Sequence, residues 1–543
     1  MLPIDFEFIS KMAPLLIPCP AQTSLKSKVI ASCVLGLLII AIIFFIWKWP
    51  FRRDAVIKEL EAESLGKVTI GFLRSTYFPH PGCVLEHVVF QHNPQPGSAP
   101  LITIEHVRIE TSFARLFTRH LKLVRAEGMH IRIPPLGSEK FETPQRPTVV
   151  IDDLVADGAV LEAASRVGNS PVKFTFHGFT ISHVGGYGPA PFKATLSNAV
   201  PPGTITTNGK FGPWNADDVG KTPVSGEYYF EQADLNAFSG ISGILSSSGK
   251  FDGTVEHVAV DGTTDVPLFA VNMSSHKVAL KTRFQAVVNA ENGDTFLQNV
   301  VASFNQTNIW TQGSVAGKET QRGKTAALEM SSKDGRIEDL LLLFSKSPRP
   351  PMSGAVSFKA KVSVPSGEKA FLERLELQGD FGIDDGSFTK IDTQQGVNSL
   401  SRGALGEENP KPANEQPDPQ NVLSGLKGHV LLRNGTARFS DLSFSVPGAL
   451  AQMQGTYNLI SEKIDLHGTL KTMAEVSKTT HGIKALMLKV LDPFFKNKPS
   501  GYVAPVKITG TYNHPSFALD LGNRNNDKNQ TAKTHHLTDQ AKH

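Results

Sequence analysis

The chain has 543 residues, of which 40% are hydrophobic and 20% are charged, and its formal net charge is +4. This length exceeds one compact domain, and this balance excludes both a disordered chain and a strongly basic nucleic-acid-binding protein. Cys83 is the only cysteine after residue 33, so no disulfide can form within the downstream chain, and no Cys/His spacing indicates a metal site.

The first predicted element is a membrane span at residues 29–49, preceded by a short cytoplasmic N-terminus at residues 1–28. Residues 29–47 carry no charge, and as a helix this run covers roughly 28 Å of hydrocarbon. Trp47 and Trp49 stand where an interfacial aromatic belt would lie. A cleaved signal peptide is disfavoured, because the apolar run is long and no small-x-small cleavage site follows it before Arg52.

The orientation of this span does not follow from charge, since lysine and arginine flank both of its ends. We expect a cytoplasmic N-terminus, because a large downstream domain can be translocated largely regardless of its charges. Asp54 then opens a short helical pattern with Val56, Ile57 and Leu60 on one face, followed by strand-like stretches. A second helical pattern runs from Phe113 to Leu121. Residues 50–135 are predicted as a membrane-proximal module.

Residues 136–393 are predicted as a β-rich body, because apolar and polar side chains alternate along it. The apolar members of two such runs are candidates to line a groove: Val172, Phe174, Phe176, Val356, Phe358, Val362 and Val364. Turn signals punctuate the runs at Pro201-Pro202-Gly203, Asn292-Gly293-Asp294, Asp385-Gly386 and Asn434-Gly435, which predicts an antiparallel meander. Few helical patterns could cover the apolar faces, so a second sheet or an apolar ligand must do so. For any single side chain, ordinary packing remains the alternative to ligand contact.

A helix is predicted over Ile337–Phe344, ended by Pro348. Residues 394–420 are expected to form a flexible loop, residues 421–522 a C-terminal β region, and residues 523–543 a disordered tail. Within the β region an amphipathic helix is predicted at 481–496, and its apolar stripe consists of Ile483, Leu486, Met487, Val490, Leu491 and Phe494. This helix either docks on the sheet, capping a groove, or lies on a membrane surface. The tetrapeptide GTYN occurs at Gly455 and again at Gly510, as a repeat or by coincidence.

The sequence holds no recognisable catalytic constellation. It contains no GxSxG, no phosphate-cradling P-loop and no HExxH. His535 and His536 are expected in solvent, and Asp384-Asp385 precedes a glycine, which favours a turn over paired catalytic carboxylates. We therefore expect a protein that is not an enzyme and that uses no cofactor and no metal.

Several strings carry a family resemblance. NGTARFSDLSFSVPGALAQMQGTYNL, IDLHGTLKTMAEVSKTTHGIKALMLKVLDPFFKNKPSGY and VKITGTYNHPSFALDL, within 431–521, resemble the AsmA-like C-terminal region. Upstream, PPGTITTNGKFGPWNADDVGKTPVSGEYYFEQADL and NGDTFLQNVVASF resemble the middle of AsmA-like proteins, and the span followed by a helix and strands resembles their chorein-like start. The resemblance covers about Val29 to Leu521.

This resemblance implies a fold and a function. The fold class expected is mostly β: an N-terminal transmembrane helix, then an elongated, twisted antiparallel sheet of the repeating β-groove type with a few short helices. The function implied is that of a single-pass bacterial inner-membrane protein whose periplasmic groove shields and transfers phospholipid acyl chains, supporting outer-membrane lipid homeostasis. Expected partners are the inner membrane, phospholipid as cargo, and outer-membrane or periplasmic proteins, with no nucleic acid. The alternative functions are a scaffold for outer-membrane protein assembly and, more weakly, an enzyme with an unrecognised site.

Overall fold

The computed structural model describes residues 36, 49–64, 66–91, 100–116, 118–133, 149–163, 172–186, 188–215, 218–272, 274–290, 292–317, 323–344, 349–389, 424–446, 449–472, 503–511 and 514–519. The chain divides into two compact units, residues 1–58 and residues 59–543. In the first unit, the rings of Trp49 and Phe51 meet edge-on with their centroids 5.9 Å apart. Helix α2 (Arg53–Ser64) begins in this unit, and the helix predicted after Asp54 is thereby confirmed.

The second unit is dominated by strands, which are the following. They are β1 (Lys67–Thr76), β2 (Gly82–Gln91), β3 (Ile102–Glu110), β4 (His120–Ile133), β5 (Val150–Asp157), β6 (Ala159–Ala163), β7 (Val172–Val184), β8 (Ala190–Ala199), β9 (Pro202–Phe211), β10 (Pro223–Asp234), β11 (Ile241–Ser242), β12 (Ile244–Thr254), β13 (His257–Val271), β14 (Val278–Val288), β15 (Thr295–Phe304), β16 (Thr307–Gly317), β17 (Lys324–Arg336), β18 (Met352–Val364), β19 (Glu376–Phe388), β20 (Ser424–Arg433), β21 (Thr436–Val446), β22 (Ala449–Asn458), β23 (Lys463–Thr472), β24 (Val503–Thr511) and β25 (His514–Leu519). The helical pieces are short: η1 (Phe113–Arg115), η2 (Val219–Lys221), η3 (Leu235–Ala237), α3 (Ile337–Leu342) and α4 (Phe371–Arg374).

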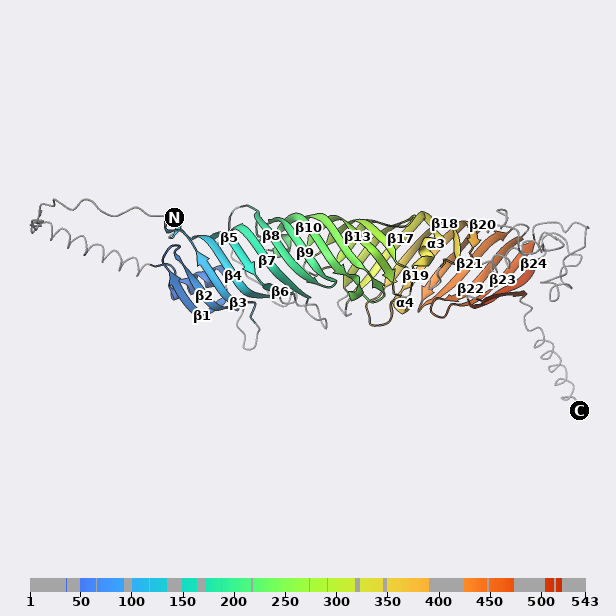
Figure 1. Cartoon of the computed structure of the whole chain (residues 1–543), viewed down its shortest axis with the longest axis horizontal. Helices are drawn as coiled ribbons and strands as arrows, with labels where there is room; N and C mark the ends of the chain where they lie inside the picture. The colour runs from blue at the N-terminus through green and yellow to red at the C-terminus, as the bar shows by residue number, and fades with distance from the viewer. Residues whose placement is uncertain are drawn as a thin grey trace, which may run out of the picture. The chain divides into compact units, whose positions relative to one another are not determined.

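These strands form one elongated sheet of 25 strands in which neighbours in sequence are neighbours in space. From β12 onward each strand pairs antiparallel with the next one along the chain, up to the β24–β25 pair. Figure 1 shows the strands slanting across the sheet in chain order. A mostly β protein with one elongated antiparallel sheet and few helices is therefore confirmed.

Two junctions depart from the antiparallel meander. At one of them β10 pairs directly with β12, and the two-residue strand β11 pairs with β13. The other lies at β4–β7. β5 and β6 both run parallel to β4, and both pair antiparallel with β7. The two short strands are one interrupted strand, broken at Gly158, whose φ of +66° bends the chain. A parallel neighbour requires a long connection, and residues 134–149, between β4 and β5, are numerous enough to provide it.

One local prediction is confirmed by the structure, and two others are wrong. Asn434-Gly435 joins β20 to β21 with φ of 49° and 69°, the left-handed geometry that a two-residue hairpin requires. The turn predicted at Asp385-Gly386 is wrong, because both residues lie inside β19, where Asp385 has a φ of 52° and the register with β18 shifts in a bulge. The second half of the helix predicted to reach Leu121 is also wrong, because β4 already begins at His120.

Candidate functional site

The register of the sheet gathers its apolar side chains on one face. Residues directly opposite each other on paired strands share a face, so a row can be followed from strand to strand. One row at the start of the sheet is Ile70, Val88, Ile104 and Met129. Rows of the same kind are Phe176, Leu196, Ile205 and Phe230, then Leu328, Val362, Leu377 and Leu432, then Leu466 and Ile508. We call the face that carries these rows the apolar face.

The apolar face is neither sealed nor fully open in its middle. Phe176, Ile205, Phe230 and Leu328 are all half-buried. Within the described residues the strands form one sheet, and no second sheet lies on this face. Leu196 and Leu432 in the same rows are buried, but the partly exposed apolar side chains between them are available to an apolar ligand.

Aromatic rings lie against glycines in the central strands. A Cβ added at Gly262 would lie 2.7 Å from the Tyr228 hydroxyl and 2.9 Å from Cζ of Phe284, and one added at Gly249 would lie 2.9 Å from Cε1 of Tyr228. A Cβ added at Gly226 would likewise lie 2.8 Å from Cζ of Phe251. These glycines leave room for the rings of Tyr228, Phe251 and Phe284, so aromatic rings cover part of the central apolar face.

Hydroxyl groups interrupt the apolar face on three neighbouring strands. Ser247, Thr264 and Thr282 are directly paired across β12, β13 and β14. The Tyr228 hydroxyl lies 3.1 Å from Ser247 Oγ, and burial raises the pKa of Tyr228. The apolar face therefore carries a narrow polar band whose hydroxyls are in part already hydrogen-bonded within the sheet.

The residues predicted to line a groove all lie on the apolar face where their side chains are described. Phe174 and Phe176 of β7 are half-buried and pair with Leu161 and Ala159, whereas the side chain of Val172 lies outside the described residues. The four residues of β18 are covered by other elements to different degrees. Val356 is 2% exposed in a cluster with Met352 and Ile383, and Phe358, Val362 and Val364 are half-buried.

Two short helices cover the apolar face at β18. Ile337, Leu340 and Leu341 of α3 pack on the cluster around Val356, and Phe371 and Leu372 of α4 pack with Val362 and Val364. Helix α3 was predicted, because its apolar spacing is helical. Helix α4 was missed, because four residues are too few to show a periodicity.

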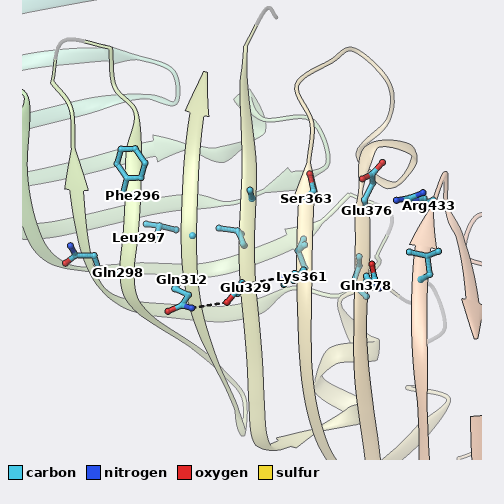
Figure 2. Close-up of a pocket in the computed structure, with 16 residues that line it drawn as sticks. Phe296, Leu297, Gln298, Gln312, Glu329, Lys361, Ser363, Glu376, Gln378 and Arg433 are labelled. Carbon is cyan, nitrogen blue, oxygen red and sulfur yellow. Dashed lines mark hydrogen bonds and ion pairs between the residues drawn. The ribbon is translucent and has the colours of Figure 1, made fainter. Parts of the chain in front are cut away.

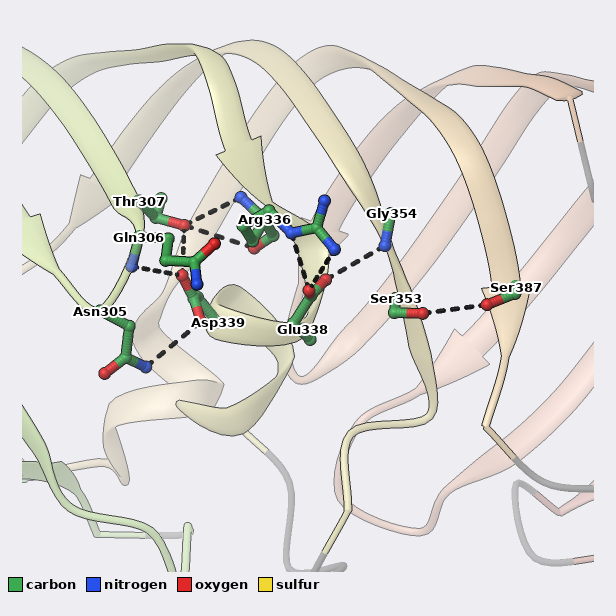
Figure 3. Close-up of polar contacts among 9 residues, drawn as sticks. All are labelled: Asn305, Gln306, Thr307, Arg336, Glu338, Asp339, Ser353, Gly354 and Ser387. Carbon is green, nitrogen blue, oxygen red and sulfur yellow. Dashed lines mark hydrogen bonds and ion pairs between the residues drawn. The ribbon is translucent and has the colours of Figure 1, made fainter.

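A buried carboxylate fixes α3 to the sheet (Figure 3). Asp339 is 6% exposed and accepts hydrogen bonds from Asn305 Nδ2 at 3.2 Å, from the Gln306 amide at 3.0 Å and from Thr307 Oγ1 at 2.8 Å. The adjacent Glu338 accepts from Arg336 Nε at 2.7 Å and from the Gly354 amide at 3.1 Å. Because these donors belong to the β15–β16 turn and to β17 and β18, α3 is held at three points.

Contacts between distant segments enclose this part of the apolar face. Ser274, in the β13–β14 connection, donates from Oγ to the Leu342 carbonyl at 2.6 Å. Gly240, with a φ of +102°, abuts Phe371 of α4, where any side chain on residue 240 would overlap the ring. The sheet therefore coils until the ends of β10–β13 reach the helices beside β18.

A hollow of about 900 Å³ crosses β15 to β20 (Figure 2). Two of its charged lining residues, Glu329 and Lys361, are directly paired, 3.7 Å apart. Gln312 Nε2 donates to Glu329 at 3.0 Å, and this hydrogen bond, with help from Lys361, holds the pKa of Glu329 below its usual range. Leu328 and Val362, which alternate with these residues, point to the apolar face. Leu328, Val362 and Leu377 nevertheless line the hollow together with the polar residues, so the hollow is not separate from the apolar rows.

The described residues offer little for catalysis. Among them no group of three or more His, Cys, Asp or Glu could hold a metal ion. Cys83 is fully buried, and burial raises its pKa to about 12, which keeps the thiol protonated and unreactive. Asp384 and Asp385 are successive residues of β19, at the bulge opposite β18.

Other predicted elements lie outside the described residues: the span at 29–49 except for Gly36 and Trp49, the loop at 394–420, the helix at 481–496 and the tail at 523–543. In the part of the chain that is described, no helix combines the length and the apolar character needed to cross a membrane. Comparison with family models, with curated proteins and with solved structures gives no match.

Proposed function

We propose that this protein shields phospholipid acyl chains on the apolar face of its sheet and transfers them along it. In this proposal the segment at 29–49 anchors the chain in a bacterial inner membrane, the sheet stands in the periplasm, and the transfer supports outer-membrane lipid homeostasis. The proposal includes membership of the AsmA family, on the strings quoted above. It requires no catalytic group, metal or cofactor.

One observation carries the proposal: directly paired apolar rows recur along the sheet, and Phe176, Ile205, Phe230 and Leu328 in its middle stay half-buried without a second sheet over them in the described residues. Exposing an acyl chain to water costs about 0.8 kcal/mol per CH₂. A ligand that keeps touching apolar side chains avoids most of this cost at every step. With strands about 4.8 Å apart, the contour across all 25 strands is on the order of 120 Å.

Two adjacent tyrosines of β10 provide the test. Tyr228 lies on the apolar face and is half-buried, whereas Tyr229 lies on the polar face and is 50% exposed. A photoreactive phenylalanine analogue at residue 228 of the full chain, irradiated in cells, is expected to capture phospholipid acyl chains, and the same group at residue 229 is not. Lipid capture that is equal at both positions, or absent at 228, would contradict the proposal.

The same experiment addresses the alternative of an assembly scaffold. A scaffold that pairs its sheet edge with client strands would yield protein adducts in place of lipid adducts. Capture of proteins by the same group on the edge strand β25, with no lipid capture at residue 228, would therefore favour the scaffold.

A further inference from the structure

Two connections lie side by side at one end of the first strands. Residues 77–81 join β1 to β2, and residues 111–119 join β3 to β4; in an antiparallel run both connections lie at the same end of the strands. The Thr111 amide donates to the Pro81 carbonyl at 2.9 Å, and Thr111 Oγ1 donates to the His120 carbonyl at 2.7 Å. Thr111 is 1% exposed and Leu116 is 5% exposed. The two connections therefore form one packed platform.

Three aromatic side chains project from this platform. Phe78 is 86% exposed, Phe113 is 52% exposed and Tyr77 is 49% exposed. Thr111, Pro81 and Leu116 already supply the packing that holds the connections together. Leaving large aromatic groups in water is unfavourable, and a cluster of them at the tip of paired loops is typical of a surface that contacts something apolar. We call Tyr77, Phe78 and Phe113 the aromatic tip.

Basic groups stand beside the aromatic tip. Arg74 is exposed on β1, Arg115 pairs with Asp152 at 2.6 Å, and Arg119 pairs with Glu59 at 3.1 Å. Asp152 also receives a hydrogen bond from His120 at 2.6 Å. This bond is the main cause that lowers the pKa of Asp152, Arg115 adds to it, and the carboxyl stays ionised at neutral pH. Three arginines against two carboxylates leave the tip with a surplus positive charge, which favours an anionic surface.

The chain also limits where the tip can be. Eighteen positions separate Trp49 from Lys67, where β1 begins, and part of this connection is the helix α2. A helix rises only about 1.5 Å per residue, so the start of β1 lies within roughly 45 Å of the end of the apolar run, and the ion pair of Arg119 with Glu59 ties the second connection to α2. Aromatic side chains next to arginine are the composition found at membrane interfaces.

We propose that the aromatic tip seats the first strands on the bilayer that holds the anchor, with Phe78 and Phe113 inserted at the boundary between headgroups and acyl chains. The partner is a bilayer containing anionic phospholipid. This inference rests on the proposed function for the anchor, and it places the first strands of the sheet beside the membrane.

The test measures membrane depth by spin labelling of the full chain. Cys19 and Cys33 are replaced by serine, buried Cys83 is kept, and a nitroxide is attached at Phe78→Cys, at Phe113→Cys or at the control Ile460→Cys, which is 55% exposed in the β22–β23 turn. In vesicles of phosphatidylethanolamine and phosphatidylglycerol, labels at 78 and 113 are expected to collide readily with oxygen and poorly with a water-soluble nickel complex. The label at 460 is expected to behave in the opposite way.

Labels at 78 and 113 as accessible to nickel as the label at 460 would overturn the proposal. A Phe78→Glu/Phe113→Glu double variant, which alters exposed side chains and should leave circular dichroism unchanged, is expected to lose immersion of a label at Tyr77→Cys. Retained immersion in that variant would also overturn it. Photocapture at residue 228 separates the two proposals: an immersed tip without lipid capture refutes only the conduit, and lipid capture with a tip in water refutes only the seating.

Discussion

At the scale of single residues, Cys83 shows how strongly the first strands are packed. The side chain is fully buried on β2, opposite Ser75 and Ile109, and burial raises its pKa to about 12. Only the thiolate is nucleophilic, so a buried thiol with this pKa is inert. Because the unfolded chain would release its proton near the ordinary pKa of about 8.5, this residue makes the folded state less stable as the pH rises from there toward 12.

We therefore expect Cys83 to resist alkylation by iodoacetamide in the native full chain at about pH 8 and to react once guanidinium unfolds it. Mass spectrometry of the peptide that contains residue 83 measures the modified fraction, and an Ile460→Cys variant, at a position that is 55% exposed, serves as the reactive control. Alkylation of native Cys83 as fast as in guanidinium would mean that β1–β3 open readily.

At the scale of elements, the sequence predicts strands better than it predicts their cover. Alternation along 356–364 correctly placed Val356, Phe358 and Val362 on one face of β18, because a strand has a side-chain period of two. The same alternation cannot reveal that α3 roofs Val356, since that depends on where a helix six residues long docks. Nor does it reveal the ring of Tyr228 above Gly249 and Gly262, which depends on cross-strand register.

The turn error at Asp385 has a similar origin. An aspartate followed by glycine suits any left-handed backbone position, and a bulge inside a strand offers the same φ as a hairpin turn. Only the partner strand distinguishes the two, because β18 continues alongside and absorbs the extra residue as a register shift. At Asn434-Gly435 the flanking strands pair with each other, and the prediction is correct.

Helix α3 offers a test at this scale, because one carboxylate satisfies three donors. An Asp339→Ala substitution leaves the groups of Asn305, Gln306 and Thr307 without this acceptor in a buried site, a loss of about 1–3 kcal/mol for a buried unsatisfied group. We expect faster hydrogen exchange in 337–343 and at the Gln306 amide, with β1–β9 unchanged. Asp339→Asn, which keeps one acceptor oxygen, should have a smaller effect. Equal exchange in both variants and the native chain would show that apolar packing alone holds α3.

At the scale of the whole molecule, the meander makes the sheet nearly one-dimensional. Each strand contacts chiefly its neighbours in sequence, so stability is built from local pairs, much as in repeat proteins. The apolar rows inherit this order, because every strand must contribute side chains to the same face for a row to continue. A ligand that moves along the face must therefore pass each strand in turn, and the path has no parallel branch in the described residues.

If the ligand passes every strand in turn, a charge at any point of the apolar face should block its movement. Phe176→Asp in β7, Tyr228→Asp in β10 and Leu466→Asp in β23 each put a carboxylate on the apolar face. Each is expected to slow phospholipid transfer between vesicles by about tenfold or more, because the acyl chain must pass an ion that costs at least about 1.4 kcal/mol to approach. Thr175→Asp, Tyr229→Asp and His467→Asp, on the polar face of the same strands, should leave transfer unchanged. A path shared by the whole sheet makes the three apolar-face positions equivalent. Loss of transfer in only one apolar-face variant, with native circular dichroism in all six, would therefore contradict the path and indicate that the ligand occupies one discrete pocket.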